Sequence, residues 1–153
     1  MALALFDRPL TPSVSFTPNT AAYSIGDVIG GALTFDVSQS SNGAGFLMGV
    51  LAADNEGIGA AGALWLFKEN LATPIADGDP FAIVFADYAN FLTTVTLDAY
   101  ATLSTFKHSL TRPDEVPMLH WTKSTIIGYW VASGTPDWAA SKSAYVQLKM
   151  LTQ

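Results

Sequence analysis

The chain has 153 residues, of which 50% are hydrophobic and only 13% are charged, with no cysteine and two histidines. Because an average soluble domain is about 25% charged, charged side chains cover this folded surface at about half of the usual density. A net charge of −6 with seven scattered basic residues excludes the clustered basic footprint of a nucleic-acid-binding protein, and the lack of cysteine excludes disulfides and thiolate chemistry.

The sparse charge predicts that part of the surface is apolar. Contiguous exposed apolar patches usually mark contact surfaces. We therefore expect a building block of an assembly before an enzyme. No stretch approaches the roughly 20 apolar residues of a membrane helix, and the start of the chain lacks the basic region of a signal peptide.

Residues 1–22 contain Pro9, Pro12 and Pro18, which remove backbone donors and exclude a helix or a central strand. This segment is either a frayed terminus or an extended N-terminal arm that lies on a neighbouring subunit. Three apolar side chains could anchor such an arm: Phe6, Val14 and Phe16. We place the boundary between the arm (1–22) and the main domain (23–153) near Tyr23.

The rest of the chain has the pattern of short strands separated by turn-forming residues. Strand interiors are rich in Val, Ile, Thr and aromatic residues, and several alternate with period two. The predicted strands are 27–37, 45–54, 63–68, 82–85, 91–97, 102–110, 125–132 and 145–151. Helical turns are expected only over 87–92 and 139–146. Eight or so short strands predict an all-β, single-domain antiparallel β-sandwich of jelly-roll type.

Two predicted strands, 46–51 and 63–67, are apolar on both faces, whereas a sandwich strand normally has one polar face. Either a segment of the same chain covers the outer face, or that face is an oligomer interface; the sparse charge favours the interface. On the second strand, Trp65 and Phe67 must face away from the leucines that alternate with them. One pair fills the sandwich, and the other meets another chain or a covering segment.

Residues 57–62 (GIGAAG) match the G-x-G-x-x-G pattern of dinucleotide-binding loops. Such a site needs a helix to begin at the loop, so that its amides meet the pyrophosphate. Residues 63–70 are too short and too aromatic for that helix, and Asp54 and Glu56 would place carboxylates beside the phosphates. We interpret the segment as a flexible Gly/Ala hairpin loop.

The only carboxylate cluster in the sequence is Asp77, Asp79 and Asp87. Oxygen-rich loops bind calcium, but Asp-Gly-Asp-Pro is an ordinary tight turn and the spacing fits no EF-hand. His108 and His120 have no carboxylate or nucleophile at a telling spacing, and we interpret them as structural or surface residues. The sequence therefore predicts no catalytic, cofactor-binding or metal-binding residues.

The aromatic residues allow two interpretations: they line a carbohydrate groove, or they are core or contact anchors. Sugar binding also needs converging amide and carboxylate groups, and none can be placed beside these rings. We therefore favour core or interface. The residues in question are Trp65, Trp121, Trp130, Trp138, Tyr88, Tyr100, Tyr129 and Tyr145.

Residues 22–30 (AYSIGDVIG) resemble a segment of many small tailed-bacteriophage structural proteins, in which a Tyr, a Gly-Asp pair and an apolar strand begin a β-sandwich. The resemblance continues through 64–67 (LWLF), 74–81 (PIADGDPF) and 144–151 (AYVQLKML), and covers roughly residues 20–151. It is carried by the order of these short motifs along the chain.

The resemblance implies a virion protein without catalysis: a capsid decoration (cement) protein, a head fibre or a tail component. We expect a homo-oligomer, trimer or dimer, on the phage particle surface that binds the major capsid protein and bridges capsomers, without cofactor, nucleic acid or membrane. The alternatives are a tail or fibre component, a carbohydrate-binding β-sandwich module and, least favoured, an enzyme.

Overall fold

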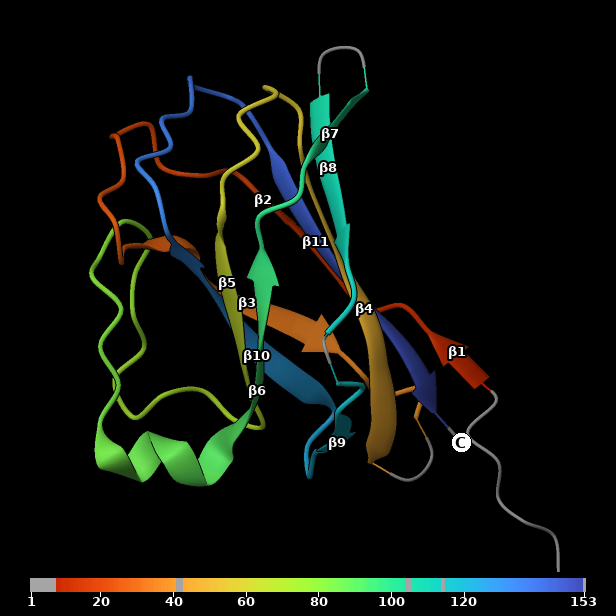
Figure 1. Cartoon of the computed structure of the whole chain (residues 1–153). Helices are drawn as coiled ribbons and strands as arrows, with labels where there is room; N and C mark the ends of the chain where they lie inside the picture. Colours follow the sequence, from red (N-terminus) through yellow and green to blue (C-terminus); the bar gives the residue numbers. More distant parts are fainter. Residues whose placement is uncertain (1–7, 41–42, 104–105, 114, 153) are drawn as a thin grey trace, which may run out of the picture.

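The computed structural model describes residues 8–40, 43–103, 106–113 and 115–152, and shows two antiparallel sheets packed face to face (Figure 1). A single short 3-10 helix, η1 (Phe85–Asn90), appears among these residues. The strands are β1 (Arg8–Leu10), β2 (Ser13–Phe16), β3 (Val28–Asp36), β4 (Ala44–Asp54), β5 (Gly62–Phe67), β6 (Phe91–Leu97), β7 (Ala101–Leu103), β8 (Phe106–Thr111), β9 (Met118–His120), β10 (Thr125–Ala132) and β11 (Ala144–Thr152).

The strand order is that of a jelly roll. One sheet has the order β1-β11-β4-β8-β7, with β2 also paired to β11 and β9 to β4; the other has the order β3-β10-β5-β6. The chain thus folds as one long hairpin whose arms pair in nested order: β2 with β11, β3 with β10, β4 with β8 and β9, and β5 with β6. Two sheets wound in this way are a double Greek key, which confirms the predicted fold.

Seven of the eight predicted strands are present, with ends that differ by one or two residues. The segment 82–85 is not a strand but leads into η1, so the expected turn at 87–92 begins two residues earlier. The segment 102–110 is divided into β7 and β8. No helical turn occupies 139–146, because Ser141 has a left-handed φ of 65° and β11 begins at Ala144 to pair with β4.

Residues 8–16 pair with the edge of the chain's own sandwich, in the segment that we interpreted as either a frayed terminus or an extended arm. In β1, Arg8 pairs with Thr152, and in β2, Val14 pairs with Val146. Proline is tolerated at the edge of a sheet, because an edge strand forms backbone hydrogen bonds on one side only and can lack an N–H donor on the other. Phe16 packs edge-on against Trp130, with ring centroids 6.3 Å apart. Phe6 lies outside the described residues.

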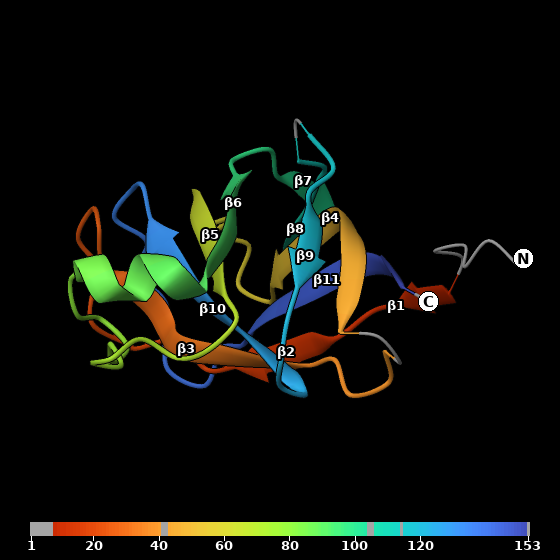
Figure 2. The ribbon, with the colours of Figure 1, turned by 90° about the horizontal axis from the view of Figure 1, so that it is seen from below.

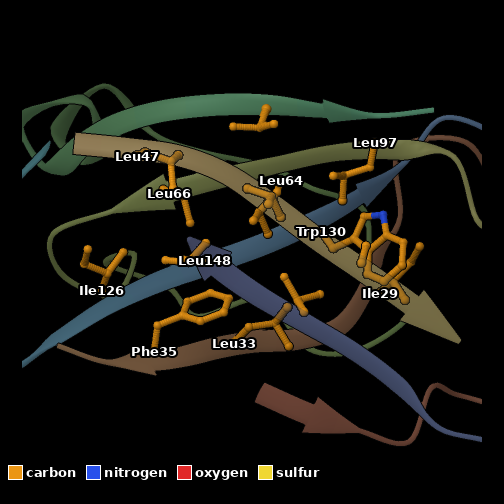
Figure 3. Close-up of a cluster of buried hydrophobic side chains, with 14 of the residues drawn as sticks. Ile29, Leu33, Phe35, Leu47, Leu64, Leu66, Leu97, Ile126, Trp130 and Leu148 are labelled. Carbon is orange, nitrogen blue, oxygen red and sulfur yellow. The ribbon is translucent and has the colours of Figure 1, made fainter. Parts of the chain in front are cut away.

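The main core lies between the two sheets, and Figure 3 shows the side chains that meet there. They come from alternate positions of strands in both sheets, as the pleat requires. Fully burying such a side chain contributes about 1.5–3 kcal/mol to folding. The labelled members are Ile29, Leu33, Phe35, Leu47, Leu64, Leu66, Leu97, Ile126, Trp130 and Leu148, each fully buried.

A segment of the same chain covers the outer face of the four-stranded sheet. Residues 71–91 run across this face, on the side away from the seven-stranded sheet (Figures 1 and 2). They enclose a second apolar cluster in which Phe67 is buried and Trp65 is partly buried. Leu64 and Leu66 fill the sandwich, so the two pairs face opposite ways as predicted. For this strand, the covering segment replaces the expected oligomer interface.

Candidate interaction surface

The outer face of the seven-stranded sheet has no such cover among the described residues, and it is apolar over β4, β8 and β9. Along β11, Leu148 and Met150 are buried against the core, so Lys149 between them points outward. The same alternation turns out Met48 on β4 and Leu110 on β8. We call the following four residues the outer apolar face: Met48 (40% exposed), Leu110 (54%), Val116 (49%) and Met118 (46%).

This face contains a hollow of about 340 Å³, which we call the outer hollow. Gly49 is one of its lining residues, and a Cβ there would lie 3.2 Å from the Thr111 carbonyl oxygen and 3.7 Å from Leu110 Cδ1. The hollow is mostly apolar, and two basic residues are among those that line it. Its lining residues are Met48, Gly49, Leu110, Arg112, Pro113, Val116 and Lys149.

A second exposed apolar feature is the tip formed by η1 and the residue before it. Phe85 is 92% exposed, and Val84 and Tyr88 are each more than half exposed. We call Val84, Phe85 and Tyr88 the aromatic tip. Asp87 in the same turn points inward, where its carboxylate accepts hydrogen bonds from the Ala72 and Val84 N–H groups, both at 2.9 Å. The tip therefore presents aromatic rings without an exposed charge.

The glycine-rich loop at 57–62 binds its own carboxylate. Asp54, only 3% exposed, accepts four hydrogen bonds at 2.5–3.1 Å from the backbone N–H groups of residues 56–59. The amides that a dinucleotide phosphate would need are thus occupied, and β5 follows instead of a helix. The loop is also no hairpin, since β4 and β5 lie in different sheets.

Two side chains fix this loop, where we expected flexibility. The Tyr100 hydroxyl donates to the Ala60 carbonyl at 2.9 Å, and the Lys107 ammonium donates to the Ile58 carbonyl at 3.3 Å. Gly59 has a left-handed φ of 63°, and a Cβ there would meet Lys107 Cδ at 2.6 Å. The glycine pattern therefore serves close packing.

The three clustered aspartates hold separate parts of the fold. Asp77 accepts hydrogen bonds from the Tyr23 hydroxyl at 2.6 Å and from the Gly30 N–H at 2.7 Å. Asp87 anchors η1, and Asp79 lies in the turn that bonds back to β3 through its carbonyl. Within the described ranges, no three His, Asp or Glu side chains are grouped as a metal site requires.

The two histidines do not meet. His108 on β8 pairs with Ala53, and His120 on β9 pairs with Ala44, at the opposite end of β4. Nine residues of strand separate these points, which is about 30 Å. His108 Nδ1 is buried without a hydrogen-bond partner, whereas His120 is exposed. The two histidines therefore belong to different parts of the sheet.

Three of the four tryptophans are buried, which confirms the core interpretation for them: Trp121, Trp130 and Trp138. The fourth, Trp65, packs against Phe81 and Phe91 under the covering segment, at ring-centroid distances of 5.2 and 5.6 Å. The tryptophans therefore form no aromatic platform on the surface.

Three tyrosine hydroxyls are held inside the fold. Burial is the main cause that raises the pKa of Tyr23 above its ordinary value, and its hydrogen bond to Asp77 adds to this. Burial likewise raises the pKa values of Tyr100 and Tyr129. Tyr129 donates to the side chain of Asn70, the residue that precedes the covering segment, and so ties β10 to the start of that segment.

No protein-family model and no curated protein sequence matches the chain. Among solved structures, a similar chain occurs in the full particle of Israeli acute paralysis virus heated to 63 degrees, with a TM-score of 0.32 and 10% identity. The alignment covers 95% of this chain and 71% of that chain. A TM-score this low carries no argument, so the jelly-roll assignment depends on the strand order. Within the described part of the chain, no helix is long and apolar enough to span a membrane.

Proposed function

We propose that the protein is a non-enzymatic structural component of a phage virion, a capsid decoration protein that self-associates and bridges capsomers. The observation that carries the proposal is the outer apolar face. It is an exposed sheet surface over β4, β8 and β9, in a chain whose charged side chains are few. Such a patch on a small domain is typical of a protein contact surface.

The mechanism is adhesion through buried area. A stable specific interface needs to bury about 1,000 Å² or more, with an apolar centre and a polar rim. The outer apolar face supplies apolar contact through Met48 and Leu110, and the basic residues Arg112 and Lys149 line the same hollow. No covalent step is required, and the clustered acidic residues have structural partners that account for them.

The choice of a virion component depends on the resemblance to tailed-phage structural proteins, because a jelly roll alone also serves lectins and other proteins. The segments that carry this resemblance are structurally central. Residues 22–30 lead into β3, residues 74–81 belong to the covering segment, and residues 144–151 form β11. A tail or fibre component would use the same contact chemistry and is the alternative within this class.

The test is to locate the protein in virions of the phage that encodes it. Purified particles are separated into heads and tails, and the chain is quantified by mass spectrometry against the major capsid protein. Many copies per head are expected. Recovery with tails would overturn the decoration assignment in favour of the tail alternative, and absence from particles would overturn the virion role. A glycan-binding assay tests the carbohydrate alternative, for which we expect no binding.

A further inference from the structure

We propose that the aromatic tip of one copy docks into the outer hollow of a second copy, so that the protein assembles head to tail. This inference rests on the self-association in the proposed function and names the two surfaces that make the contact. It joins the most exposed aromatic side chain among the described residues to an apolar hollow elsewhere on the same chain.

The tip and the hollow lie on opposite sides of the molecule. In Figures 1 and 2, η1 lies beyond the four-stranded sheet, whereas β4 and β8 belong to the seven-stranded sheet on the other side. Phe85 therefore cannot reach the hollow of its own chain. A single partner also cannot engage both surfaces at once, which excludes a reciprocal two-fold dimer. Contacts of this kind generate a ring when the rotation closes, and an open chain when it does not.

The two surfaces match in size. A closed apolar cavity of roughly 150 Å³ accommodates benzene. The outer hollow, at about 340 Å³, has room for the Phe85 ring and part of Tyr88, whose ring centroid lies 6.4 Å from that of Phe85.

They also match in chemistry. The tip exposes aromatic rings without a charged group, because the Asp87 carboxylate points inward and accepts hydrogen bonds from backbone N–H groups. The hollow offers the thioether of Met48, which favours aromatic contacts, and the cation of Arg112, which favours the face of an aromatic ring. The Lys149 ammonium at the same hollow donates to the Gln147 side chain at 3.0 Å.

The tip is held in position before binding. Asp87 holds the start of the turn by accepting from the Val84 N–H, and it ties the turn to the Ala72 N–H, which is 15 residues away in sequence. The covering segment beneath it packs on Phe67 and Tyr129. Docking therefore costs little conformational entropy, because few rotors become ordered on contact.

Engineered cysteines test the contact directly, because the natural chain contains none. The Phe85→Cys and Leu110→Cys variants are prepared separately, mixed at micromolar concentration and treated with a short bismaleimide crosslinker. The mixed pair is expected to give at least tenfold more crosslinked dimer than either variant alone. The matched control pairs Leu110→Cys with Ile25→Cys, since Ile25 is an exposed apolar residue (72%) outside both surfaces.

Crosslinking of Phe85→Cys with itself, or of Leu110→Cys with itself, in excess of the mixed pair would show a symmetric contact and overturn the inference. A yield equal to that of the control pair would also overturn it. A second pair, Tyr88→Cys with Val116→Cys, repeats the test at neighbouring positions. Presence of the chain in heads without the crosslink would refute only this inference, and the crosslink with absence from particles would refute only the virion role.

Discussion

Gly30 shows how a single residue sets the geometry where the two sheets meet. Its φ of 79° is left-handed, and its N–H donates to Asp77 at 2.7 Å. A Cβ at this position would lie 2.3 Å from the ring of Phe16. The glycine thus lets β2 approach β3, and the Phe16 ring closes the core against Trp130.

Replacing Gly30 with alanine is expected to destabilise the protein by about 2–5 kcal/mol, the sum of left-handed strain and overpacking. Gly26→Ala is the matched control, because Gly26 also has a positive φ of 93° but has nothing within 4 Å of a Cβ. It should cost only the strain, about 1–2 kcal/mol. Equal losses in urea unfolding for the two variants would contradict the close-approach explanation.

Because three tyrosines are buried, we expect the free energy of unfolding to fall at alkaline pH. Burial holds the pKa values of Tyr23, Tyr100 and Tyr129 above the ordinary value of 10.0. A group whose pKa is raised by folding contributes stability that is fully present below its unfolded pKa and is lost as pH rises above that value. We therefore expect constant stability from these groups up to about pH 10 and a decline above it.

The measurement is the ultraviolet absorbance of phenolate against pH, recorded together with circular dichroism. Part of the tyrosine absorbance should appear only as the fold is lost, whereas the protein in guanidinium should titrate fully near pH 10. Complete titration near that pH in the folded state would show that these hydroxyls are accessible and contradict the account.

At the scale of elements, hydrophobic periodicity predicts the sandwich well, because a strand with one buried face alternates apolar and polar residues. It identifies β3, β6 and β10 closely. It fails for β1 and β2, whose strand character comes from pairing with β11 and is hidden by prolines. It allows a covering segment over Trp65 and Phe67 but does not locate it at 71–91, since nothing in the local pattern of these residues shows which strand they cover.

Truncation tests whether β1 and β2 contribute to the stability of the domain. Deleting residues 1–16 removes both strands and the Phe16 ring from the core edge. We expect a loss of roughly 2–4 kcal/mol in the free energy of unfolding, because an apolar contact and a row of β11 hydrogen bonds disappear. Deleting only residues 1–7 leaves β1 and β2 in place and serves as the control. A fully stable 1–16 deletion would show that the segment is a dispensable arm.

At the scale of the whole molecule, the sparse charge correctly predicts that an apolar surface is exposed, but it does not locate that surface. Both 46–51 and 63–67 are apolar on two faces, yet only the outer side of the first is open. The sequence names Tyr88 as a core or contact residue but places Phe85 in a strand, so it does not predict the aromatic tip that the two form. In the same turn, the Asp87 carboxylate is bonded inward.

The most direct test of the central claim, that the outer apolar face is a contact surface between copies, is the mass of the protein in solution. Light scattering of the full chain at micromolar concentrations should give a multiple of the 16.2 kDa subunit mass. Leu110→Asp, which places a charge in the face, should shift the population to monomer, and Ile25→Asp should leave it assembled. A wild-type chain that remains a monomer throughout this range would contradict the account.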